Sequence, residues 1–211
     1  ENFLGCTSLA SITIPSSITS IGIQAFSNCA ALTSIHIPSS VEIIGVGAFE
    51  NCSKLSTITV DSDNKNYFSQ NGILYNKRQT ELVCYPAGKA NLNFDIPFTV
   101  VTITSNAFEG CSSLTSVTIP DSVRTMGDSV FSGCSKLVSV TIGSGISTLK
   151  AYVFSGNSSL RDIYIRGNIT SINSAFSNIT TSNVKVHLPV DADRAVWTNE
   201  GFPSSSLITT Y

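Results

Sequence analysis

Apolar residues recur along this chain with a period of about 23 residues. A typical repeat carries a Phe, a Cys three residues later, a Leu three further on, and then two Ile or Val residues separated by one polar residue; the last two repeats have lost the Cys. A single repeat cannot bury its own large side chains, so stacked repeats must cover one another. The pattern therefore predicts a solenoid, anchored by Phe3, Phe26, Phe49, Phe108, Phe131, Phe154 and Phe176.

The Ile and Val pairs predict one short β-strand in every coil. Alternation with Ser or Thr places one face of the strand in the core and the other in solvent. Pro15, Pro38 and Pro120 directly follow such pairs and end the strands. A second apolar pair predicts an extended run on the opposite wall, and about two helical turns or a 3₁₀ segment are expected around each Phe and Cys. Stacking at the strand spacing of ~4.8 Å then sets equivalent residues above one another.

The interval between Phe49 and Phe108 is 59 residues instead of 23, which indicates an irregular insert at residues 61–94. Within the insert, apolar and polar residues alternate on both sides of the segment 77–80. This arrangement predicts a β-hairpin in which Ile73–Asn76 pairs with Glu81–Tyr85. The hairpin is expected to stay attached to the solenoid as an irregular coil.

Both ends of the chain depart from the repeat. Residues 1–6 match the middle of a repeat, which predicts that the chain is a fragment of a longer protein. Residues 184–211 are expected to form a C-terminal cap, with a last strand at Val184–Leu188 and a short helix that Asp191 caps and that runs through Trp197. Trp197 and Phe202 would shield the final coil. Residues 1–211 are thus predicted to form a single solenoid domain.

The unit Ala-Phe-x-x-Cys-x-x-Leu-x-x-Ile-x-Ile-Pro-x-Ser-Val-x-x-Ile-Gly resembles the BspA-like leucine-rich repeats of bacterial cell-surface proteins. The resemblance covers essentially the whole chain, including "GILYNKRQTELVCYPAGK" in the insert and "VHLPVDADRAVWTNEGF" near the end. It implies an α/β repeat solenoid dominated by β-structure. In this right-handed leucine-rich-repeat solenoid, a parallel sheet lies on one side and short helical or 3₁₀ turns lie on the other. The resemblance also implies an adhesion or binding role, although it carries over no fixed binding motif.

Composition supports a globular chain and narrows its partners. Of the 211 residues, 42% are hydrophobic and only 12% are charged, and Ser, Thr and Asn take the place of charges. That composition argues against disorder. The net charge of −2 provides no general attraction to nucleic acid or anionic membranes. No apolar run is long enough to span a bilayer, so no membrane insertion is expected.

The six cysteines leave two interpretations open. Ladder cysteines in neighbouring coils would have Cα atoms about 5 Å apart, which a disulfide can bridge. However, Asn157 and Ile179 occupy equivalent positions, and the spacing after Phe points each sulfur inward. Buried free thiols, which behave as small apolar residues, are therefore the favoured interpretation. Cys84 fits neither scheme.

The sequence predicts neither a metal or cofactor nor an enzyme. His36 and His187 are the only histidines and lie far apart, and no Cys-x-x-Cys pair is present. His187 lies near Asp191 and Asp193, a weak hint of a catalytic dyad, but no nucleophile accompanies them.

The outward-facing strand residues are the candidate binding surface. Ser and Thr dominate these positions, as expected for a solvated strand, and a few residues break the pattern. The predicted ligand-binding residues are His36, Thr59, Thr118, Thr141, Asp162 and Tyr164. Lys77 and Arg78, at the hairpin tip, are the alternative contact.

The expected function is a non-catalytic binding or adhesion module at the cell surface or secreted, acting as a monomer. Its partner would be an extracellular or host protein or a glycan, because concave solenoid faces are common binding surfaces. The alternative is a passive structural stalk without a ligand of its own.

Overall fold

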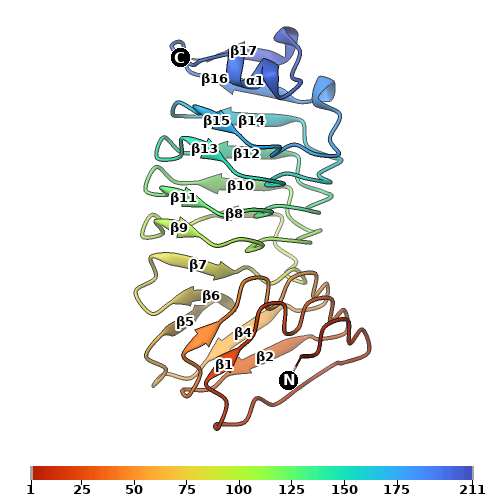
Figure 1. Ribbon diagram of the computed structural model, residues 1–211, viewed down its shortest axis with the longest axis vertical. Coiled ribbons are helices and arrows are strands. Elements are labelled where there is room, and N and C mark those ends of the chain that lie inside the picture. Colours follow the sequence, from red (N-terminus) through yellow and green to blue (C-terminus); the bar gives the residue numbers. More distant parts are fainter. Residues whose placement is uncertain (1, 211) are drawn as a thin grey trace.

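The computed structural model describes residues 2–210 and shows a β-solenoid whose coils stack along one long axis (Figure 1). This confirms the predicted leucine-rich-repeat solenoid with parallel sheets. Two walls run along the axis. We call the wall that carries the main strand of each coil the front wall, although it is the more distant wall in Figure 1. The back wall carries the second, shorter strand together with the strands of the insert.

The front wall contains two separate parallel sheets. The first pairs β2 (Ser34–Ile37) with β4 (Thr57–Val60). The second has six strands, in the order β17 (Leu207–Thr209), β16 (Lys185–Leu188), β14 (Asp162–Ile165), β12 (Ser139–Ile142), β10 (Ser116–Ile119) and β8 (Asn93–Asp95). The register places equivalent repeat positions side by side, as in Val117 opposite Val140. Like residues therefore stack on like residues, as the period predicts.

The back wall is divided into three sheets. At its ends, β1 (Ser20–Ile21) pairs with β3 (Ile43–Ile44), and β13 (Thr148–Leu149) pairs with β15 (Ser171–Ile172). Between them lies a sheet in the order β11 (Thr125–Met126), β9 (Thr102–Ile103), β7 (Glu81–Cys84), β6 (Ile73–Asn76) and β5 (Tyr67–Gln70).

Around each ladder Phe the chain forms consecutive turns closed by i→i−3 hydrogen bonds, the 3₁₀ pattern, without a continuous helix. The backbone N–H of Phe26 donates to Ala48 O in the next coil (2.8 Å), whereas the N–H of Cys29 closes a turn onto Phe26 O (3.1 Å). A helix would need every N–H to bond four residues back along the same segment. The residue two after each Phe also has a positive φ and is always Gly or Asn, at Gly5, Asn28, Asn51, Gly110, Gly133, Gly156 and Asn178.

Two hydrophobic cores lie inside the solenoid. We call residues 3–60 the N-terminal stack and residues 81–209 the C-terminal stack, because the buried residues of each form a separate cluster. Phe rings of neighbouring coils lie 4.9–5.7 Å apart within each stack. Tyr85 extends the second ladder, with its ring 5.0 Å from that of Phe108. The strands of the two stacks run obliquely to each other (Figure 1).

The insert lies between the two stacks. β6 and β7 pair antiparallel, as the hairpin pattern predicts, and β5 adds a strand that the pattern did not indicate. β6 is buried on both faces: Leu74 packs into the core of the N-terminal stack, whereas Ile73 and Tyr75 pack into that of the C-terminal stack. Solenoid pairing is already restored at β7, which pairs in parallel with β9.

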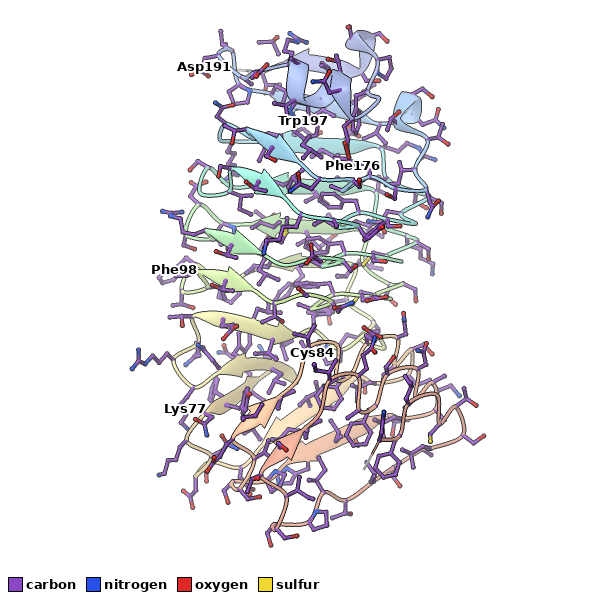
Figure 2. All side chains as sticks on the ribbon, in the orientation of Figure 1. Lys77, Cys84, Phe98, Phe176, Asp191 and Trp197 are labelled. Atoms are coloured by element: carbon purple, nitrogen blue, oxygen red, sulfur yellow. The ribbon has the colours of Figure 1, made fainter. Side chains whose placement is uncertain are left out.

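The C-terminal segment packs on the last coil. The segment contains helix α1 (Ala195–Asn199) and the 3₁₀ turns η1 (Thr181–Asn183) and η2 (Ser204–Ser206). Trp197 and Phe202 are buried, with their rings 5.9 and 4.9 Å from that of Phe176; Figure 2 shows Trp197 beside Phe176. Within residues 2–210, no helix has the length and apolar character needed to cross a bilayer.

Two expectations for this segment were wrong. The first turn of α1 is held by Asp193, whose Oδ1 accepts from the N–H of Ala195 (2.9 Å), and not by Asp191. The strand at Val184–Leu188 is not the last one, because β17 pairs in parallel beyond β16. The sequence before β17 contains Ser204-Ser205-Ser206 and has no repeat motif, so the period provides no signal for this strand.

Candidate binding surface on the front wall

The outward row of the front wall is interrupted at the boundary between the stacks. Thr118, Thr141 and Tyr164 are neighbours in the register of the six-stranded sheet, and Asp162 lies two residues before Tyr164 on the same strand. His36 and Thr59 are neighbours on the separate two-stranded sheet. The structure therefore divides the six predicted binding residues into one group of four and one group of two.

The group of four gains a partner that was not among the predicted binding residues. His187 follows Tyr164 in the row, and the two rings stack with centroids 4.2 Å apart and planes within 15°. Nε2 of His187 lies 2.9 Å from Oδ1 of Asp162. The side chain of His187 is only 15% exposed, whereas Tyr164 is 40% exposed. We call Tyr164, His187 and Asp162 the aromatic cluster.

The aromatic cluster is rigid and presents one free ring face. Because His187 covers one side of the Tyr164 ring, the opposite side faces the neighbouring strand, where Thr141 is short. Asp162 in turn holds the imidazole in place. A fixed aromatic ring can receive a ligand without a further loss of side-chain freedom.

A shallow depression of about 350 Å³ lies beside the cluster, lined by Thr141, Tyr164, Ile165, Arg166, Pro189 and Thr210. Charges of both signs lie around it. Arg166 is exposed at its edge and is near enough to Asp121 to help lower the pKa of that carboxyl, whereas Lys185 lies beside Asp162 at the other end of the strands. The one nearby carboxylate of the cluster is already engaged with His187.

The N-terminal stack has a different arrangement around His36. Its Nδ1 lies 3.0 Å from the hydroxyl of Thr59, and its Nε2 lies 3.0 Å from Oδ1 of Asp61. The other carboxylate oxygen of Asp61 accepts from the backbone N–H of Ser39 (2.9 Å). Both ring nitrogens thus have partners, one in the stack and one at the start of the insert. The side chain is 55% exposed, and no aromatic ring of residues 2–210 stacks on it.

His187 could have been found by register alone. It stands 23 residues after Tyr164, in the same outward row, which places the two rings on adjacent strands. Sequence proximity had suggested Asp191 and Asp193 as its partners, but the structure pairs it with Asp162, one coil earlier. Side chains that contact each other across neighbouring coils of a solenoid are about one period apart in the sequence. Proximity in the sequence is therefore a poor guide to such contacts.

The ladder thiols are structural hydrogen-bond donors. The sulfurs of Cys29, Cys52 and Cys134 lie 3.0–3.2 Å from the carbonyl oxygen of the Phe in the preceding coil. Burial raises the pKa of Cys52 to about 12, so this thiol keeps its proton and donates it. These cysteines and Cys111 are buried and free, which confirms the favoured interpretation, whereas Cys6 is exposed.

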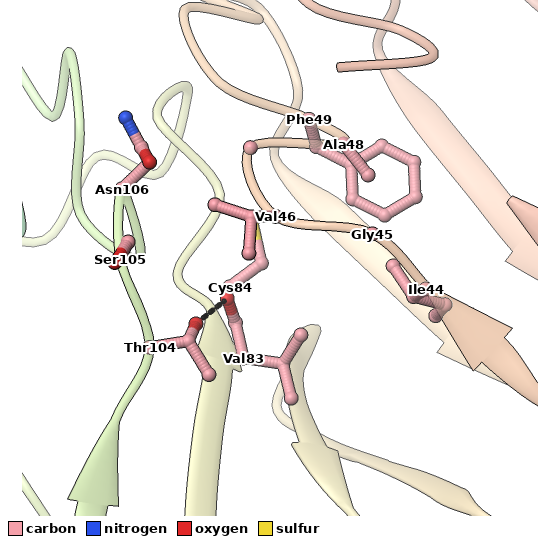
Figure 3. A pocket seen from close by; sticks show the side chains of 11 residues that line it. Ile44, Gly45, Val46, Ala48, Phe49, Val83, Cys84, Thr104, Ser105 and Asn106 are labelled. Carbon is pink, nitrogen blue, oxygen red and sulfur yellow. Dashed lines mark hydrogen bonds between the residues drawn. The ribbon is translucent and has the colours of Figure 1, made fainter. Parts of the chain in front are cut away.

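A small cavity marks the boundary between the stacks. It measures about 50 Å³ and lies between β3 and β7, lined by apolar residues such as Ile44, Val46 and Phe49 together with Cys84 (Figure 3). The hydroxyl of Thr104 donates to Val83 O (2.9 Å). The volume admits one or two water molecules, so the cavity is a packing gap.

Comparisons with known proteins agree with the repeat pattern. The model of the BspA type leucine rich repeat region, six copies, matches residues 1–86 and 83–193. A leucine rich cell surface protein from Faecalibacterium prausnitzii is 33% identical, with a TM-score of 0.80 over 98% of this chain and 55% of its own. A leucine-rich repeat protein from Eubacterium ventriosum is 27% identical, with a TM-score of 0.64 over 85% of this chain and 56% of its own.

The pneumococcal vaccine antigen PcpA is 18% identical, with a TM-score of 0.69 over 92% of this chain and 60% of its own, and shares the fold. The chain thus spans a little over half the length of the first two of these proteins. No curated protein matches it. On the family model and the shared solenoid, the chain belongs to the BspA-type leucine-rich repeat family.

Proposed function

We propose that this chain is a non-catalytic binding module that engages a protein or glycan at the C-terminal end of its front wall. The observation that carries this proposal is the aromatic cluster. A half-exposed Tyr164, fixed by His187 and Asp162, stands beside the small hydroxyl side chains of Thr141 and Thr118. Exposed Tyr and Arg side chains are over-represented among residues that dominate binding energy.

The solenoid supports this role by its shape and rigidity. Stacked coils present an extended surface that does not need to fold on binding, so ligand contact costs little conformational entropy. The predicted residues Thr118 and Thr141 continue the surface away from Tyr164. His36 and Thr59 lie on the other sheet, and we place them outside the main contact.

The proposed location is the cell surface or the extracellular medium. The solved relative from Faecalibacterium prausnitzii is described as a cell surface protein, and it aligns with 98% of this chain. An exposed location would suit a module that binds host or extracellular ligands. Members of the family generally act without catalysis, and the proposal includes no reaction.

Binding arrays of extracellular matrix proteins and glycans test the proposal. We expect at least one ligand to bind, and Tyr164→Ala to weaken that binding at least ~10-fold through loss of the ring. His36→Ala is the matched control, because it removes another exposed residue of the row from the N-terminal stack, and it should leave binding unchanged.

The opposite results would favour other functions. Silence across a broad panel would favour a passive stalk, a role that the continuous hydrophobic ladders also suit. Loss of binding on Lys77→Gln with Arg78→Gln, without an effect of Tyr164→Ala, would move the contact to the exposed hairpin tip.

A further inference from the structure

We infer that the depression beside Tyr164 binds an acidic sugar ring, one that bears a carboxylate or a sulfate. The inference rests on the proposed function and names the ligand class for the same surface. Three features of the site carry it: the free face of the Tyr164 ring, the short hydroxyl side chains beside it, and the unpaired guanidinium of Arg166.

The ring face provides the platform. Sugar rings present C–H groups that pack against flat aromatic faces. Tyr164 has one such face available, because His187 stacks on the other at 4.2 Å. Thr141 and Thr118 occupy the same row on the next two strands, so the space above these small side chains extends over roughly 10 Å, two strand spacings, toward Asp95 on the third strand. A single pyranose ring fits in that space.

The polar lining suits the hydroxyl groups of a sugar. Thr141 and Thr210 line the depression with hydroxyl groups. The hydroxyl of Thr210 donates to Leu188 O (3.2 Å) and can accept from a ligand, whereas that of Thr141 can both donate and accept. The volume of about 350 Å³ lies at the lower end of the range of small-molecule sites, which corresponds to one or two sugar units. The depression is too shallow and polar for an apolar ligand.

Charge selects an acidic sugar over a neutral one. Among residues 2–210, no carboxylate forms an ion pair with the exposed Arg166. The pKa of Asp121 is lowered mainly by the backbone N–H of Ser144, and Arg166 contributes only a smaller part. The guanidinium is therefore available for a carboxylate or sulfate, to which Arg pairs with two parallel hydrogen bonds.

An acidic peptide is the competing occupant. It would use Arg166 in the same way, but it would not need a flat ring face beside two small residues. The combination of Tyr164 with Thr141 favours the sugar. A neutral sugar would still bind through Tyr164 and would not need Arg166, whereas an acidic peptide would depend on Arg166. The experiment tests this difference.

Calorimetric titration of the full chain with three probes tests the inference. Hyaluronan tetrasaccharide carries carboxylates, heparin tetrasaccharide carries sulfates as well, and chitotetraose is neutral. We expect one acidic probe to bind at least ~10-fold more tightly than chitotetraose, and its identity distinguishes carboxylate from sulfate. Arg166→Gln should weaken the acidic probe at least ~10-fold and leave chitotetraose unchanged. Tyr164→Ala should weaken both probes.

The same probes, with two further variants, provide the controls and the results that would contradict the inference. Tyr164→Phe keeps the ring and should retain binding, and His36→Ala should have no effect. Circular dichroism checks that each variant is folded. Equal affinity for acidic and neutral probes, or no affinity for any, overturns the inference. If a protein from the array binds and Tyr164→Ala abolishes that binding, the proposed function stands without the sugar; if nothing binds, both fail.

Discussion

The N-terminal and C-terminal stacks are built from the same repeat, but they are covered to different extents. In the N-terminal stack, the first coil leaves Phe3, Ile12 and Ile14 only partly buried, and the front sheet has two strands. In the C-terminal stack, the front sheet has six strands, and Trp197 closes the last coil. The comparison shows that the neighbours of a coil, more than its own residues, determine how much apolar surface it buries.

β6, the strand between the stacks, also shows that burial depends on the neighbouring coils. Leu74 and Ile73 are adjacent residues of β6, yet they belong to different cores because side chains alternate across a strand. β6 takes the place of a covering coil for both stacks. The insert therefore interrupts the repeat without exposing either core at the boundary.

The largest expected effect compares equivalent Phe residues in the two stacks. Phe131→Ala removes a ring that is covered on both sides and should lower the free energy of unfolding by about 3–5 kcal/mol. Phe3→Ala removes a ring that is covered on one side and should cost about 1 kcal/mol. Chemical denaturation followed by circular dichroism measures both. Equal costs would show that the position in the stack does not matter.

A second pair of substitutions separates the stacks at β6. Ile73→Ala should destabilise the C-terminal stack and Leu74→Ala the N-terminal stack, each by about 2–4 kcal/mol. Trp197, the single Trp of the chain, reports on the C-terminal stack by its fluorescence. Only Ile73→Ala should shift the fluorescence transition. A shift of the same size with Leu74→Ala would mean that the two cores unfold as one.

A smaller effect tests the thiol ladder. Asn157 stands at a Cys position of the C-terminal stack; it is fully buried, and both side-chain amide atoms are unpaired among the described residues. Asn157→Cys should stabilise the protein by about 1–2 kcal/mol, because it removes two unsatisfied polar atoms and restores a thiol donor. Cys134→Asn is the matched reverse change and should destabilise. Thermal unfolding measures both, and destabilisation by Asn157→Cys would contradict the ladder's role.

The smallest expected effect is a pH dependence at the boundary. The carboxylate of Glu109 accepts from the side-chain amide of Asn51 in the other stack (3.3 Å) and from that of Asn106. Burial raises its pKa, so the folded state binds the proton more tightly than the unfolded state. The stabilisation is then present below the unfolded pKa of about 4.3 and is lost as pH rises through the folded value.

Glu109→Gln removes this titration. The stability of the natural chain relative to the variant should therefore fall between pH 4 and pH 7, as measured by denaturation at several pH values. A relative stability that rises over this range would show that Asn51 and Asn106 outweigh the effect of burial.

Much of the fold followed from the period, because stacked coils convert a 23-residue spacing into contact. The register of Val117 with Val140 and the hairpin of β6 with β7 were predictable in this way. That the turns at each Phe form no continuous helix was not predictable from the period, although the Gly or Asn two residues later signals a positive φ.

Candidate site residues were predictable in part. The outward row identified Tyr164 and Asp162, whereas the stacking of His187 and the division of the row at the insert depend on three-dimensional packing. The predicted role of these residues in binding stays a prediction.

Hydrogen exchange of matched backbone amides tests most directly whether neighbouring coils determine stability. The N–H groups of Phe26 and Phe131 make equivalent bonds to the next coil, 2.8 and 2.9 Å long. Because local opening depends on the surrounding packing, the Phe131 amide should exchange at least ~10-fold more slowly than the Phe26 amide. Equal rates, or slower exchange at Phe26, would contradict the account.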